Sequence, residues 1–122
     1  MHSERSIRGI EPVLPSQDIE RDIKWHKEFT GFEYAFGDKK YAGIKREYQV
    51  IHLQWHADNE HDPLLGGSVI KIFVHDIEPY AMEFIERGTI KLDKYQRHTP
   101  WGTHEFGFND LNGNAIYIVQ DN

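Results

Sequence analysis

The stretch Val69-Ile70-Lys71-Ile72-Phe73-Val74 decides the fold, because it opens a unit that repeats the first half of the chain. Its β-branched and aromatic residues predict a strand. A helix is expected next, with Asp76 as its cap, Pro79 in its first turn and Gly88 as its stop. Strand-like segments then follow at residues 89–92, 104–108 and 115–119.

The first half shows the same order of elements. A strand is predicted at residues 10–14, followed by a helix that begins at Ser16 or Asp18, reaches about Thr30 and ends at Gly31. Each half therefore reads as strand, helix and three strands. A four-stranded sheet with one helix cannot cover both of its own faces, so two such units are expected to pair. The strand-like segments of this half are residues 32–37, 41–45 and 49–54.

These patterns predict an α+β fold of two tandem βαβββ modules that form a curved sheet and a cleft. Module one is expected at about residues 8–56 and module two at about 67–121, within a single domain that spans residues 1–122. The polar, turn-forming segment 57–63 and the Gly66-Gly67 pair separate the two modules.

Composition narrows the class of function. The net charge of −6 argues against a nucleic-acid partner, because phosphate binding needs a basic surface. The absence of cysteine excludes disulfides, thiolate metal sites and cysteine nucleophiles. The polar N-terminal residues are not followed by an apolar run, and no stretch reaches the length of a membrane span, so neither a signal peptide nor a membrane partner is expected. We expect a cytoplasmic protein.

Two motifs resemble the glyoxalase-like, or vicinal-oxygen-chelate, superfamily. The first is PVLPSQD at residues 12–18, followed by a helix that ends at Thr30-Gly31-Phe32. The second is TPWGTHEF at residues 99–106, which leads into DLNGN at residues 110–114. This second segment is similar to one found in the bleomycin-binding proteins of the bleomycin-resistance branch. The resemblance covers about Ile10 to Gln120 and implies the fold predicted above.

The resemblance also locates the four positions that hold a metal in metal-dependent relatives. By position they fall on Glu11, His52, Val69 and Tyr117. Catalytic centres of this kind keep at least three N or O ligands from the protein. Val69 cannot coordinate a metal, and a neutral tyrosine is a poor ligand, so we expect no metal, no cofactor and no catalytic residue at these vestigial positions.

Without a metal, the resemblance implies a homodimer that sequesters a ligand in grooves at the subunit interface. An N-terminal strand is exchanged at a proline in such dimers, and Pro12 occupies the matching place. The implied ligand is a bleomycin-like antibiotic or another planar compound, because flat rings stack on aromatic side chains. The groove residues transfer by position to Phe36, Tyr41, Gln54, Phe73 and Trp101.

Two alternatives accompany this hypothesis. The chain is an enzyme of the same superfamily, a metal-dependent isomerase, thiol transferase or dioxygenase, if the four positions bind a metal after all. Phe36 and Phe73 are core residues rather than groove residues if their strands bury them, the commoner fate of phenylalanine. Lys71 and His75 place positive charge beside the second module, which favours a ligand other than a cationic glycopeptide.

Overall fold

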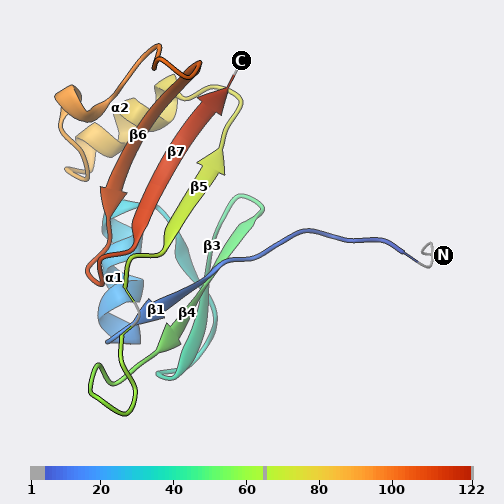
Figure 1. Cartoon of the computed structure of the whole chain (residues 1–122), viewed down its shortest axis with the longest axis vertical. Coiled ribbons are helices and arrows are strands. Elements are labelled where there is room, and N and C mark those ends of the chain that lie inside the picture. Colours follow the sequence, from blue (N-terminus) through green and yellow to red (C-terminus); the bar gives the residue numbers. More distant parts are fainter. Residues whose placement is uncertain (1–4, 65, 122) are drawn as a thin grey trace.

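The computed structural model describes residues 5–64 and 66–121. The strands and helices follow the order that the two modules predict, apart from one strand of module two (Figure 1). None of the described helices is long and apolar enough to cross a membrane. The elements of module one are β1 (Val13–Ser16), α1 (Ile19–Phe29), β2 (Glu33–Gly37), β3 (Tyr41–Arg46) and β4 (Gln49–Trp55). Those of module two are β5 (Val69–Phe73), α2 (Glu78–Glu86), a 3-10 helix (Leu92–Lys94), β6 (Thr103–Asn109) and β7 (Ala115–Asp121).

The two modules form two sheets with related topology. Sheet A has the order β1-β4-β3-β2, and sheet B has the order β5-β7-β6. In each sheet the first strand of the module pairs in parallel with its last strand, and the remaining neighbours are antiparallel. Module one is thus the βαβββ unit that the sequence predicts.

Module two departs from the prediction at residues 89–92, which do not form a strand. After α2, the amides of Thr89 and Ile90 both bond to the carbonyl of Phe84, so the chain turns back under its own helix. Ile90 is thereby buried among the core residues beneath α2. Sheet B therefore has three strands instead of four. In place of the missing strand there is a single bridge between Gln96 and Glu105, beyond the 3-10 helix.

Both helices start and stop close to where the sequence places them. Asp18 caps α1 by accepting a bond from the amide of Arg21, so the cap is Asp18 rather than Ser16. At α2 the cap position is Ile77, without a side-chain cap bond, and Asp76 just before it accepts a bond from the amide of Glu78 instead. Gly31, with φ of 74°, follows the end of α1, as the sequence predicts.

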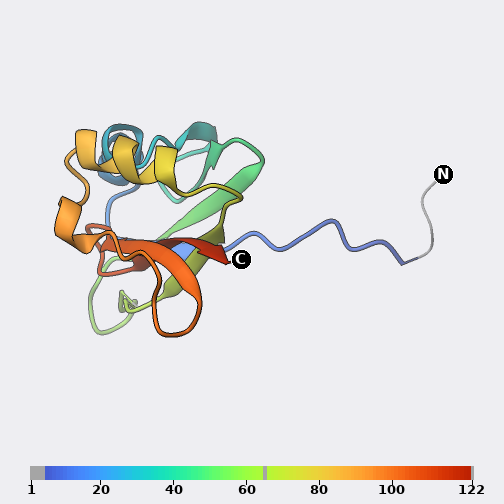
Figure 2. The ribbon, with the colours of Figure 1, turned by 90° about the horizontal axis from the view of Figure 1, so that it is seen from above.

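Helices α1 and α2 lie on the same side of the two sheets, as Figure 2 shows. The core fills the space between the helices and the sheets. Alternation along β4 turns Ile51 and Leu53 toward α1, and the same alternation along β6 and β7 turns Phe106 and Ile118 toward Phe84 of α2. Neither helix covers the opposite side of either sheet, which we call the open face.

Asparagine side chains of the β6–β7 turn join the two modules. Asn112 donates to Asp22 of α1 at 2.7 Å and accepts bonds from the amide of Gln17 and from Arg21, each at 3.0 Å. Asn114 donates to the carbonyl of Pro15 at 3.1 Å. The sequence identifies this segment as a hairpin turn, which is confirmed, and the structure adds that its buried amides hold β1 and α1 in place.

Candidate functional site

The open face of sheet A carries three of the expected groove residues. Strand alternation places Tyr41 and Gln54 opposite each other on β3 and β4. Phe36 reaches the same face because β2 has an irregularity between Tyr34 and Phe36. Its ring lies over Gly43, where an added Cβ would come within 2.1 Å of the ring, so only glycine leaves room for it. All three side chains are exposed, and Phe36 is therefore not a core residue.

A hydrogen-bonded chain of side chains runs beside these aromatic rings. Nε2 of His52 lies 2.8 Å from Oε1 of Glu11, and Nδ1 of His52 lies 2.8 Å from the hydroxyl of Tyr41. The bond from His52 is the main cause that lowers the pKa of the Glu11 carboxyl. With Glu11 ionised, Nε2–H of His52 donates to it, and Nδ1 of the same ring is hydrogen-bonded to the hydroxyl of Tyr41.

This arrangement involves two of the four positions to which the resemblance assigns metal ligands. Glu11 and His52 lie together, but they bind each other, and the second ring nitrogen of His52 is taken by Tyr41. Val69 is exposed on β5 and has no donor atom. The ring of Tyr117 packs over Gly107, where an added Cβ would meet it at 2.5 Å. Across residues 5–64 and 66–121, no group of three or more His, Asp or Glu side chains is placed to hold a metal ion.

The open face of sheet B is hollowed into a basin of about 570 Å³. Trp101 forms one wall, and 63% of it is exposed. It stands in the turn before β6, where Gly102 has φ of 88° and lets the chain reverse. Tyr117 and Val69 belong to the floor. Trp101 is thus a surface residue with an available ring face, as its place between Pro100 and Gly102 suggests.

Glu105 is a site residue that the sequence reasoning did not single out. It lies on the basin side of β6 and is only 8% exposed. Its Oε2 accepts bonds from the hydroxyl of Thr103 at 2.9 Å and from the indole Nε1 of Trp101 at 3.4 Å. In the sequence, the feature that could have identified Glu105 is a carboxylate within an apolar strand, four residues after a loop tryptophan. Glu105 orients the indole and so defines the wall of the basin.

Phe73 is exposed as well, but it belongs to a different hollow. With 58% of it exposed at the end of β5, it lines a cavity of about 250 Å³ between that strand and the β3–β4 turn. Arg46 and Tyr80 line the same cavity. The structure therefore brings together Phe36, Tyr41 and Gln54 on sheet A, whereas Phe73 and Trp101 line two separate hollows of module two.

The chain is similar to known proteins in structure rather than in sequence. No protein-family model and no curated protein matches the chain. A solved bleomycin-binding protein complexed with bleomycin superposes with a TM-score of 0.77 at 17% identity, over 95% of this chain and 100% of the other. The bleomycin-binding protein from Streptomyces verticillus, complexed with copper(II)-bleomycin, gives 0.71 at 24% identity, over 97% and 98%.

A third neighbour is a glyoxalase-related enzyme from Clostridium phytofermentans. Its TM-score is 0.69 at 17% identity, over 99% of this chain and 100% of the other. Binding proteins and an enzyme thus share the arrangement of sheets and helices seen here, and the shared architecture does not by itself choose between their functions. The chain has the glyoxalase/bleomycin-resistance fold that its sequence motifs predict.

Proposed function

We propose that the chain is a metal-free binding protein that sequesters a bleomycin-like or other planar molecule in grooves between two copies. The observation that carries the proposal is the exposure of aromatic side chains on both open faces. Phe36 and Tyr41 stand on sheet A, and Trp101 stands on sheet B. Aromatic rings in a concave, partly apolar surface are the usual partners of flat ligands.

Pairing of two chains follows from the apolar surface that a single chain leaves in water. Large exposed apolar patches on a protein mark interaction sites, and a second copy is the commonest partner. A dimer in which sheet A of one chain faces sheet B of the other closes a groove on each side of the two-fold axis. The exposed apolar residues that support this are Val13, Phe36, Val69 and Trp101.

The N-terminal segment supports the same assembly. Residues 5–10 extend away from the body of the protein (Figure 1). Ile7 is 93% exposed and Ile10 is 89% exposed, a costly arrangement for an isolated chain. We propose that this arm lies on the partner chain, with Pro12 at the point where it leaves its own sheet.

Sequestration needs no chemistry, because binding alone lowers the concentration of free drug. The bond between Glu11 and His52 supports a binding role over metal-dependent catalysis, since it occupies the two ligating side chains that the metal positions retain. In the proposed groove, Trp101 of one chain stacks on one side of the ligand, and Tyr41 of the other chain closes the opposite side. Phe36 lines the floor.

A fluorescence titration tests this proposal. Bleomycin and a planar acridine are titrated against the wild type, Trp101→Ala and the control Trp55→Phe, which removes a tryptophan at the far end of sheet A. A stacked ring is worth roughly 1–3 kcal/mol, so Trp101→Ala should weaken binding by about one to two powers of ten. The control should bind as the wild type does. Equal affinity of Trp101→Ala and wild type for every compound that binds would show that the site lies elsewhere.

A further inference from the structure

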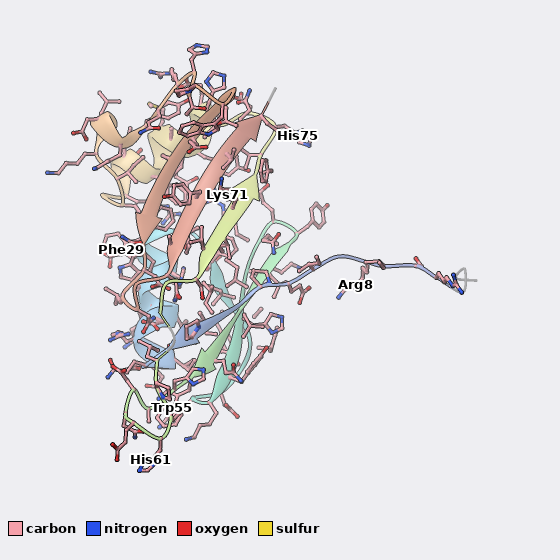
Figure 3. All side chains as sticks on the ribbon, viewed as in Figure 1. Arg8, Phe29, Trp55, His61, Lys71 and His75 are labelled. Carbon is pink, nitrogen blue, oxygen red and sulfur yellow. The ribbon has the colours of Figure 1, made fainter. Side chains whose placement is uncertain are left out.

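Two lysines stand at the rim of the sheet B basin. Lys71 projects from β5, where Figure 3 labels it, and Lys94 ends the 3-10 helix. Both are exposed. Within residues 5–64 and 66–121, neither ammonium has a carboxylate oxygen within 4.0 Å, although nine other cationic groups or histidine rings do form such pairs. These two positive charges are therefore available to a bound molecule.

Glu105, the one carboxylate that lines this basin in the described part of the chain, is already engaged. It is nearly buried and accepts bonds from Thr103 and Trp101. Its charge is thus directed at the protein's own donors. The groups that a ligand meets first are the ammonium ions of Lys71 and Lys94, so the basin presents a positive rim on a chain whose net charge is −6.

The surface between these charges suits a flat ring. The ring of Tyr117 lies against Gly107 in the floor, and the ammonium of Lys71 lies 5.9 Å from the centre of that ring. Trp101 rises beside the floor with its indole nitrogen directed at Glu105, which leaves a ring face open. A planar group against Trp101 and Tyr117 places its edge toward the two lysines.

We infer that the preferred ligand of this basin is a planar aromatic anion, whose ring stacks on Trp101 and whose carboxylate or sulfonate reaches Lys71 and Lys94. This inference rests on the proposed function, and it gives that function a substrate class. Complementary charge at a binding surface selects partners more than it adds affinity, so the lysines are expected to set which planar molecules are accepted.

Three ring-matched probes test the charge preference: 9-anthracenecarboxylate, 9-anthracenemethanol and 9-anthracenylmethylammonium. Each is titrated against the full-length protein by quenching of tryptophan emission. The carboxylate should bind about three- to ten-fold more tightly than the neutral alcohol, the range expected for two exposed ion pairs together. The ammonium compound should bind more weakly than the alcohol.

Variants that each remove one lysine charge identify the residues responsible for the preference for the carboxylate. Lys71→Gln and Lys94→Gln should each lower the affinity for the carboxylate by about two- to three-fold and leave the affinity for the alcohol unchanged. The matched control is Lys91→Gln, which removes the same charge from an exposed position outside the basin lining and should change neither. Circular dichroism confirms that each variant is folded.

The outcomes separate this inference from the proposed function. If the ammonium probe binds at least as tightly as the carboxylate and Trp101→Ala weakens both, the site is a planar-ligand site and the anion preference is wrong. If the two lysine variants bind the carboxylate as the wild type does, the inference is also wrong. If Trp101→Ala leaves the binding of all three probes unchanged, the proposed function itself fails.

Discussion

Glu11, just before the first strand of module one, is hydrogen-bonded to His52 in the last strand of that module, with 2.8 Å between Oε1 and Nε2. The contact exists because β1 pairs in parallel with β4, with Val13 opposite His52, and Glu11 precedes that pair. Two positions that the resemblance assigns to metal ligands are here joined by an internal hydrogen bond.

Protein purified without chelator should accordingly contain far less than one equivalent of zinc, nickel, manganese or iron. A site with two protein ligands that already bind each other competes poorly for a metal. Elemental analysis of wild type and Glu11→Gln should give the same low content. One full equivalent in the wild type that disappears in Glu11→Gln would revive the alternative of a metal-dependent isomerase, thiol transferase or dioxygenase.

His26 should make the protein sensitive to mild acid. Burial lowers its pKa to about 4 despite the nearby charge of Asp22, and its Nε2 has no hydrogen-bond partner. Because the folded-state pKa lies below the unfolded value of about 6.5, the unfolded chain binds the proton more readily. The associated stability is complete above pH 6.5 and is lost as the pH falls toward 4. At pH 5 the loss is about 2 kcal/mol.

Urea unfolding at pH 7 and pH 5 measures this loss. In His26→Gln, which cannot titrate, the difference between the two pH values should shrink by about 2 kcal/mol. His61→Gln, a change at an exposed loop position, should behave as the wild type does. An unchanged pH dependence in His26→Gln would assign the acid sensitivity to other groups.

Phe73 and Phe84 should respond very differently to truncation. Phe84 is buried between α2 and sheet B, so Phe84→Ala should cost about 3–5 kcal/mol. The sequence alone makes the same cost plausible for Phe73, but Phe73 is mostly exposed, and Phe73→Ala should lower the unfolding free energy by less than about 1 kcal/mol. Denaturant titration of both variants compares the two costs. Similar losses would show that the side chain of Phe73 is buried in solution.

Removal of the Asn112 amide should loosen the junction between the modules. Asn112→Ala leaves Asp22 and the amide of Gln17 without this partner, and buried groups that lose a bond cost about 1–3 kcal/mol each. The neighbouring exposed change, Leu111→Ala, should cost little. Thermal unfolding of the two variants measures the difference. A loss no larger than that of Leu111→Ala would show that the hairpin is only a turn.

Local signals predicted the fold well because they act over a few residues. Gly31 and Gly88 end their helices with φ of 74° and 80°, which the surrounding sequence alone indicates. Local signals fail at residues 89–92, where the predicted strand does not form. Its residues suit a strand, but the hydrogen bonds of Thr89 and Ile90 to Phe84 return the chain to the helix end. Tertiary packing of Ile90 overrides its local preference.

The site was predictable only in part, for the same reason. Strand alternation places Tyr41 and Gln54 on one face, and the loop position of Trp101 indicates exposure. The bond between Glu11 and His52 joins residues 41 positions apart and depends on strand register, which no local pattern specifies. Glu105 lies within the TPWGTHEF motif, but the motif does not indicate that its carboxylate contacts the indole of Trp101.

In the proposed dimer, each groove takes Trp101 from one chain and Tyr41 from the other. Mixing two variants tests it most directly. Trp101→Ala and Tyr41→Ala should each bind the planar acridine weakly when pure. After the two are mixed and allowed to exchange subunits, half of the dimers are mixed, and each has one groove with both aromatic residues intact, so about a quarter of the wild-type binding sites should return at full affinity. If mixing restores no tight sites, Trp101 and Tyr41 do not meet across a subunit interface, and the shared groove is contradicted.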